Sequence, residues 1–483
     1  MIKSIYIKYI TFVVFILLLA ACSTPKDYTA AEMDLPEKFQ LPDSVSKNLD
    51  TVLISRETLF KDSVLVQLID QAFENNFDVR TIDKEIEIND EYFKQSKAAF
   101  YPELNLNLLG IEKEWRSKYS RQTPEGKWYN HTGKEPPENG FVNRSTFYTT
   151  AALNWEIDIW RKLRNQKRGA LALYEQSKIA KRTIQTQLVS TIAEDYYSLL
   201  MLDEQLDVAK KNHKFRDSTL SMIQLLYNSG EVTALAVQQS QTQVLEASTL
   251  ISELKERRAI QENNLRLLTG ELPGEIKRGI TLSMEGVTYE EVKEIPLYLV
   301  QNRPDVLASQ YQLTAANARV GVAQAQRLPN VSISLEGGVE SLLAENWFNI
   351  PGSLLGGITG GITTPIFRGR RLKTEYEVAK KEREISEINF QRNVYEAIVD
   401  VENTLISIKR LEDQLQIAIV SQMVAQKALQ NSRMLFQSGF ADYLEVITAQ
   451  GEALQSELNL ITTKANLLTA RIQLYRALGG GWQ

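Results

Sequence analysis

Apolar and polar positions alternate with a period of two in four short stretches. In residues 147–159 the odd positions are Phe, Thr, Ala, Leu, Trp, Ile and Ile, whereas the even positions are Tyr, Thr, Ala, Asn, Glu and Asp. Residues 331–336 alternate as clearly, residues 104–108 less so, and the fourth stretch, residues 356–365, is rich in glycine. This period predicts strands with one apolar and one polar face. Runs of about ten residues suit tilted membrane strands, although a half-buried hairpin in a soluble sheet gives the same pattern.

Longer segments follow the helical period instead. Apolar residues recur at helical spacing from Lys162 to Asn228 and from Leu372 to Gln437, and each segment would be roughly 100 Å long if it were continuous. A glycine follows each segment, Gly230 in the first and Gly439 in the second. Because glycine readily adopts the left-handed conformation that ends a helix, we expect a reversal there and a second helix running back.

The same order of elements occurs twice. Four pairs of landmarks measure the repeat: Asp78 with Asp305 at a spacing of 227 positions, Arg164 with Arg371 at 207, Gly230 with Gly439 at 209, and Gly270 with Gly480 at 210. A tandem duplication explains the two copies. The change in spacing predicts an insertion of about twenty residues in the first copy. We assign it to residues 112–143, whose Lys, Arg, Glu, Pro and Gly suit an exposed loop between two strands.

The chain therefore divides into a leading segment and two copies of one unit. Each copy holds a helical stretch, a strand hairpin and a long helical hairpin, so the fold is mainly α with four strands. In chain order the predicted parts are a signal peptide (1–21), an extended strap (22–60), repeat 1 (61–272), a linker (273–289) and repeat 2 (290–483). Repeat 1 has a helical stretch at 62–98, a strand hairpin at about 103–160 and a helical hairpin at about 162–270. Repeat 2 has a helical stretch at 290–326, a strand hairpin at about 330–366 and a helical hairpin at about 371–479.

Composition narrows the classes of function. The 483 residues include thirteen prolines, none of them between Pro137 and Pro273 or after Pro365, which permits long helices. A net charge of -5 argues against nucleic acid as a partner. One cysteine and two histidines exclude a disulfide framework and a Cys/His zinc cluster within one chain. No pattern places an acid, a base and a nucleophile together, so we expect no catalytic residues, no metal site and no cofactor.

The first residues have the features of a lipoprotein signal. Lys3 and Lys8 precede an apolar run that ends in Leu19-Ala20-Ala21-Cys22. This ending resembles the lipobox of bacterial lipoproteins, in which cleavage leaves a cysteine that carries diacylglycerol on sulfur and an acyl chain on nitrogen. Cys22 is the predicted lipidation site, and an ordinary secretory signal with a chance cysteine is the alternative. The residue after the cysteine is Ser23 rather than an acidic residue, which resembles the signal that permits transport to the outer membrane.

Four further segments carry a family resemblance: Asn302–Val306, Gly361–Leu372, Ser438–Val446 and Leu478–Trp482. Together with the lipobox and the order of elements, they resemble the TolC-like outer-membrane efflux proteins, in particular their lipoprotein (OprM/NodT-type) branch. The resemblance covers essentially the whole mature chain. It implies a homotrimer, anchored by lipid in the outer membrane, in which three chains complete a twelve-stranded membrane β-barrel and a long α-helical barrel in the periplasm. Four strands alone cannot close such a barrel, because an open edge leaves backbone groups unpaired in hydrocarbon.

The resemblance also implies a function and partners. The chain would be the passive outer-membrane channel of a tripartite efflux system for small toxic compounds, joined to a periplasmic adaptor and an RND-type inner-membrane pump. The 112–143 loop would then lie outside the cell. Two alternatives remain open: a duct of the same architecture that secretes polypeptides, and a non-channel coiled-coil lipoprotein that tethers the envelope.

In the family, the glycine turns of the helical hairpins contact the adaptor, which defines candidate docking residues here. They are Tyr227, Ser229, Gly230, Phe436, Ser438 and Gly439.

Residues just beyond the turns constrict the closed channel in the family, and the candidates here are Asp442, Leu444, Glu445 and Thr448. The family's constriction has a leucine, an acid four residues later and an arginine three further on. Leu444 fits this pattern, but Thr448 and Gly451 depart from it, so Glu445 becomes the substitute acid. Threefold symmetry would turn each acid into a ring that favours cations. Asp442 has an alternative role, because an aspartate at the start of a helix can cap it.

Overall fold

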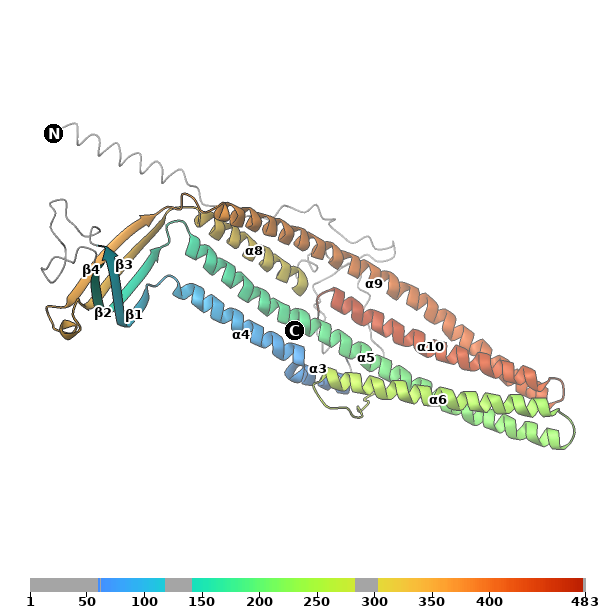
Figure 1. Ribbon diagram of the computed structural model, residues 1–483. Helices are drawn as coiled ribbons and strands as arrows, with labels where there is room; N and C mark the ends of the chain where they lie inside the picture. The colour runs from blue at the N-terminus through green and yellow to red at the C-terminus, as the bar shows by residue number, and fades with distance from the viewer. Residues whose placement is uncertain (1–59, 61, 118–140, 283–302, 481–483) are drawn as a thin grey trace. The chain divides into compact units, whose positions relative to one another are not determined.

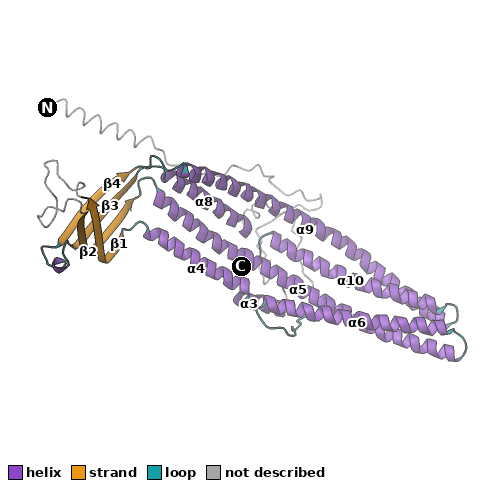
Figure 2. Ribbon diagram, in the orientation of Figure 1, coloured by secondary structure: helices purple, strands orange, loops and turns teal. Residues whose placement is uncertain are grey.

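The computed structural model describes residues 60, 62–117, 141–282 and 303–480. These residues form helices and strands that divide into two compact units (Figure 2). The strand unit is built from Asp90–Leu173 and Leu313–Ile385. The helical unit is built from the described residues among 31–89, 174–312 and 386–483. Cys22, the signal peptide and the strap up to residue 59 lie outside the described residues, as do residues 283–302.

The strand unit contains a four-stranded antiparallel sheet in the order β1-β2-β3-β4 (Figure 1). Its strands are β1 (Glu103–Ser117), β2 (Phe141–Ile157), β3 (Asn330–Ser341) and β4 (Leu354–Thr363), with a short 3-10 turn, η3 (Ala344–Asn346), between the last two. Each predicted strand hairpin is present, including the glycine-rich return strand. The two hairpins join through the pairing of β2 with β3.

The register of the sheet confirms the alternation predicted from the sequence. Leu104 pairs with Leu153, Leu153 with Leu335, and Leu335 with Ile358, so one row of leucine and isoleucine crosses all four strands. The neighbouring row is polar, because Asn154 pairs with Ser334 and Ser334 with Thr359. Ser334 Oγ donates to Asn154 Oδ1 at 2.8 Å. Successive residues of a strand point to opposite faces, so the sheet has an apolar and a polar face.

The first strand hairpin differs from expectation in two ways. Residues 112–117 and 141–143 were assigned to the inserted loop, but they are strand, and Trp115 pairs with Asn143. The ladder continues because backbone pairing requires no apolar side chains. The register of β1 also shifts between Asn107 and Gly110, a β-bulge that explains the imperfect alternation of its leucines.

The two helical hairpins have equal lengths. Helices α5 (Lys162–Asn228) and α9 (Arg371–Gln437) have 67 residues each, and α6 (Ala234–Leu268) and α10 (Tyr443–Ala477) have 35 each. Each element of the second hairpin therefore starts 209 positions after its counterpart. The predicted pairings at 207 and 210 are wrong, because the backbone pairs Arg161 with Arg370 and Gly270 with Gly479. Each of these four residues has a positive φ, of 60°, 65°, 72° and 78° respectively.

The stretch at 62–98, expected to be one helix, is two: α3 (Ser63–Asn75) and α4 (Phe77–Ala98). Asn76 separates them with φ −58° and ψ 136°. Its side-chain oxygen accepts hydrogen bonds from Asp78 N at 2.9 Å and Val79 N at 3.3 Å, which caps the second helix. In repeat 2 the described part of the corresponding stretch is α8 (Pro304–Ala325).

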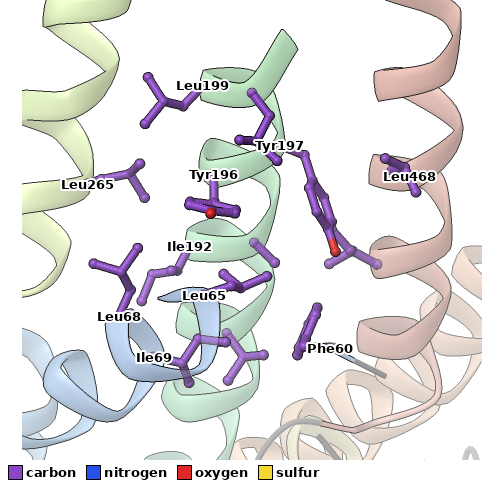
Figure 3. Close-up of a cluster of buried hydrophobic side chains, with 14 of the residues drawn as sticks. Phe60, Leu65, Leu68, Ile69, Ile192, Tyr196, Tyr197, Leu199, Leu265 and Leu468 are labelled. Carbon is purple, nitrogen blue, oxygen red and sulfur yellow. The ribbon is translucent and has the colours of Figure 1, made fainter. Parts of the chain in front are cut away.

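The main core of the helical unit lies where α3, α5, α6 and α10 meet (Figure 3). Its largest fully buried side chains include Tyr196 and Tyr197 of α5. Tyr196 Oη donates to Asp62 Oδ2 at 2.5 Å, and Asp62 Oδ1 accepts from Val64 N at 2.8 Å. The fully buried Leu65 contributes roughly 1.5–3 kcal/mol of hydrophobic free energy. This core ties the first repeat to α10 of the second.

Candidate functional site

The candidate site lies at the reversals of the two helical hairpins. Gly230 and Gly439 have φ values of 82° and 77°, in the left-handed region. Beyond them, Glu231 N donates to Leu226 O and Phe440 N to Leu435 O, each at 2.9 Å. Both bonds span five residues, as in the Schellman motif that ends helices. A Cβ built at either glycine meets nothing within 4 Å, so the conformation rather than the space favours glycine.

The candidate docking residues are mostly exposed. Tyr227 is 43% exposed, and Ser229, Gly230, Ser438 and Gly439 are exposed as well, whereas Phe436 is half-buried. The hydroxyls of the two serines donate to helix carbonyls, Ser229 to Leu225 O at 3.2 Å and Ser438 to Met434 O at 2.9 Å. The two serine hydroxyls therefore bond to the last turns of their own helices, and the residues of the turns stay exposed.

Sequence reasoning missed the most exposed apolar residue of the two turns. Phe440, next to Gly439, is 82% exposed, and Leu225 and Leu235 beside the first turn are 69% and 58% exposed. An apolar residue directly after a helix-ending glycine is a signal that could have identified Phe440. Each reversal, together with the helix ends beside it, forms a tip of the helical unit. Exposed apolar side chains at both tips give a surface suited to a protein partner.

The two tips are joined to each other within the helical unit, where α6 and α10 lie side by side (Figure 1). Tyr443 packs against the small cluster of Ile223, Ala236 and Val237, and its hydroxyl donates to Gln239 Oε1. Between the two long helices, the Arg433 guanidinium of α9 lies 4.1 Å from the centre of the Phe215 ring of α5. A movement of one tip would therefore disturb contacts of the other.

The four gate candidates are all exposed and follow the second reversal. Asp442 occupies the N-cap position of α10 with φ −81° and ψ 157°, but its side chain makes no capping hydrogen bond. Leu444 is 56% exposed. Thr448 lies one turn further along the same face, and its hydroxyl donates to Leu444 O at 2.9 Å. Asp442 therefore occupies the N-cap position, but the capping role predicted for its carboxylate is wrong, and the side chains of Asp442 and Glu445 are both exposed.

A second polar centre surrounds the start of α8. Arg303 Nη2 donates to Asp305 at 2.7 Å and to Asp400 at 3.3 Å, and Arg303 Nη1 donates to Ala477 O at 3.0 Å. Burial lowers the pKa of Arg303, but its bonds to the two aspartates outweigh burial and raise the pKa. Asp305, in the first turn of α8, therefore holds the buried Arg303 side chain and has a structural role. A cavity of about 210 Å³ adjoins this cluster and is also lined by Thr186 and Arg476.

Two acidic side chains in the middle of α5 are perturbed by burial. Desolvation raises the pKa of Glu194 and of Asp195 above their ordinary values. A hydrogen bond from Ser190 and the charge of Arg476 oppose the shift of Glu194, and a bond from Gln261 opposes that of Asp195. At both acids the effect of burial on the pKa exceeds that of these partners.

The described residues contain no group of three or more His, Cys, Asp or Glu side chains that could hold a metal ion. In the same residues, no helix combines the length and apolar character needed to cross a membrane.

Comparisons with known proteins agree with the architecture. The outer membrane efflux protein family matches residues 68–271 and 298–480. The solvent efflux pump outer membrane protein SrpC of Pseudomonas putida is 26% identical over 477 residues, covering 97% of each chain. The probable outer membrane lipoprotein SilC of Salmonella typhimurium is 26% identical over 481 residues, again 97% of each chain. The open-state MtrE outer membrane channel of Neisseria gonorrhoeae superposes with a TM-score of 0.80 at 20% identity, covering 95% of this chain and 98% of that one.

The resemblance and fold class predicted from the sequence are confirmed by these matches. Family and fold are those of outer-membrane channels rather than of enzymes. The family match takes in both repeats and most of the chain. The chain therefore belongs to the outer membrane efflux protein family and is an outer-membrane component of an efflux system.

Proposed function

We propose that three copies of this chain form a passive duct that carries small toxic compounds from a periplasmic adaptor and an RND-type inner-membrane pump to the exterior. The observation that carries this proposal is the four-stranded sheet. Strands β1 and β4 are its edges in the described residues, and one of its faces is apolar. Within a membrane each edge must pair, and pairing β4 of one copy with β1 of the next closes a twelve-stranded barrel.

The helical end of the same chain supplies the partner surface. Long helices that reverse at exposed glycine turns place the docking candidates, from Tyr227 to Gly230 and from Phe436 to Gly439, at one end of the helical unit. Exposed Phe440 belongs to this surface. The adaptor would bind the accessible turn backbone and the apolar side chains around it.

The substrate class rests on relatives whose names describe solvent efflux, which favours small molecules over polypeptides. A strain that lacks the chain should become more sensitive to dyes, detergents and antibiotics. An unchanged sensitivity, together with loss of a secreted polypeptide, would support secretion instead.

The duct itself is tested by purification and electrical recording. The protein in detergent should have the mass of a trimer and should produce discrete conductance steps in a planar bilayer. A monomer without conductance would contradict the duct and favour the envelope tether.

The gate candidates are tested in the same bilayer. Asp442→Asn with Glu445→Gln should reduce the preference for cations, because threefold symmetry makes a ring of each acid. Glu231→Gln, which removes an exposed acid from the other tip, is the matched control and should have a smaller effect. Equal selectivity in the wild type and the double variant would exclude these acids from the gate.

Lipid attachment at Cys22 is a separate part of the proposal, supported by the lipobox and by the name of SilC. Mass spectrometry of the N-terminal peptide should show three acyl chains in the wild type. Cys22→Ala should lack them, and an unmodified cysteine in the wild type would refute the anchor.

A further inference from the structure

Both strand hairpins end in a basic turn. β2 ends at Ile157 and α5 begins at Lys162, whereas β4 ends at Thr363 and α9 begins at Arg371. Three cations here have acidic partners: Lys162 with Glu156 at 2.9 Å, Arg164 with Asp158 at 3.0 Å and Arg371 with Glu375 at 3.5 Å. Five others are exposed and have no ion-pair partner among the described residues: Arg161, Lys167, Arg368, Arg370 and Lys373.

Two of these cations have an unusual backbone. Arg161 and Arg370, at equivalent positions of the two repeats, have φ values of 60° and 65°. They are the only non-glycine residues with positive φ in the described parts of the chain. For a residue with a Cβ this conformation costs about 1–2 kcal/mol, and glycine would avoid the cost. Since neither guanidinium has an ion-pair partner among the described residues, ion pairs with those residues do not account for an arginine at both turns.

The turns directly follow the end of the apolar sheet face. Ile157, Val331 and Ile362 form its last row, and Arg161 is four residues beyond Ile157. Four residues span at most about 14 Å, so the guanidinium can reach the polar layer next to hydrocarbon. In the second turn, Ile366 and Phe367 come just before the arginines and are 95% and 87% exposed. The order from apolar to basic matches the order from acyl chain to phosphate in a lipid leaflet.

We propose that Arg161 and Arg370 bind the phosphodiester group of membrane glycerophospholipids where the barrel strands continue into the helices. Arginine suits this group because its planar fork donates two parallel hydrogen bonds to phosphate oxygens. Arg368 and Lys373 add positive charge, and Ile366 and Phe367 contact the acyl chains below. Each chain provides two such sites. The proposal rests on the strand hairpins crossing the membrane, as in the proposed function.

The test is lipid retention by the purified trimer with added phosphatidylglycerol, measured by native mass spectrometry. The variant is Arg161→Gly with Arg370→Gly, because glycine suits positive φ and the backbone is relaxed rather than strained. Retained phosphatidylglycerol should fall about tenfold in this double variant. The matched control is Lys255→Gln with Arg257→Gln, which removes two exposed charges from α6 and should retain lipid like the wild type.

Two further ligands show which part of the phospholipid is recognised. Diacylglycerol, which lacks the phosphate, should be retained poorly, and inorganic phosphate should compete poorly. Equal retention in the double variant, equal retention of diacylglycerol or full competition by inorganic phosphate would each overturn the proposal. Conductance of the same samples distinguishes the failures. Conducting trimers that retain lipid without these arginines refute this site alone, whereas protein that neither trimerises nor conducts refutes the duct and this site with it.

Discussion

The helical hairpins of the two repeats agree in backbone, but the repeats differ in chemistry. Their helical hairpins have equal lengths, and left-handed residues end or begin each helix at positions 209 apart. Side chains at equivalent positions differ in charge: Asn76 corresponds to Arg303, Asp158 to Phe367, Glu194 to Asn403, and Thr233 to Asp442. The lengths of the long helices and their reversals are therefore common to both copies, whereas polar centres belong to one copy or the other. Substitutions at paired positions test this contrast.

The largest difference is expected at the start of α8. Arg303→Ala removes a buried cation that bonds two aspartates and two carbonyls, and should lower the free energy of unfolding by about 3 kcal/mol. Asn76→Ala removes a neutral cap and its bond to Leu268 O, and should cost about 1–2 kcal/mol. Denaturant titrations followed by circular dichroism measure both. Arg410→Ala, at an exposed i,i+3 pair, is the control, and equal losses at Arg303 and Asn76 would contradict the contrast.

The glycines that end α6 and α10 should differ next. A Cβ at Gly270 would lie 2.6 Å from Asn75 O, whereas at Gly479 the nearest atoms, Arg303 Cα and Cγ, are 3.2 Å away. Gly270→Ala should therefore cost about 2 kcal/mol and Gly479→Ala about 1 kcal/mol, since both also require positive φ. Gly451→Ala, in the interior of α10 with nothing of this chain within 4 Å, should instead be neutral or stabilising. The reverse order in thermal midpoints would show that the backbone contact at Asn75 relaxes.

A smaller effect is expected at the starts of the long helices. The Asp158 carboxylate accepts hydrogen bonds from Leu163 N and Arg164 N, each at 3.0 Å, and Phe367 at the equivalent position cannot do so. Asp158→Ala should destabilise by about 1 kcal/mol. Phe367→Asp should raise the free energy of unfolding by part of that amount, because an aspartate on an equivalent backbone would cap α9 in the same way. Unchanged denaturation midpoints in both variants would show that water caps these helices equally well.

The pH dependence should be the smallest difference. Burial raises the pKa of Glu194 above its ordinary 4.5, so the folded state binds more protons than the unfolded state in the window above that pH. Stability should therefore fall as pH rises through this window, and Glu194→Gln should reduce the slope and raise stability at neutral pH. Asp195→Asn should act in the same direction. Asn403→Asp, at the equivalent position of repeat 2, is the comparison, and an unchanged slope in Glu194→Gln would contradict the assignment.

Periodicity was sufficient for the long elements but not for their joints. The bounds of α5 agree with the prediction because glycine and apolar spacing act locally. The break at Asn76 could not be predicted, since its amide bonds Leu268 O, 192 positions away. The spacing of 209 was predicted at the helical reversals but not at the first and last residues of the helical hairpins, because residues of the same type, such as Arg164 and Arg371, were paired in place of residues with similar φ. Docking and gate residues came from family resemblance, and exposure added Phe440 to them.

The unequal strand hairpins have a consequence for symmetry. β1 and β2 have 15 and 17 residues, whereas β3 and β4 have 12 and 10. Each helical reversal, by contrast, follows the start of its long helix by the same number of residues in both repeats. In the proposed trimer, the helical hairpins would contribute six turns of similar backbone, whereas the strand hairpins would be three long ones alternating with three short ones. The adaptor would therefore meet a nearly sixfold surface at the turns, and a ligand arriving from outside would meet a threefold one at the strand hairpins.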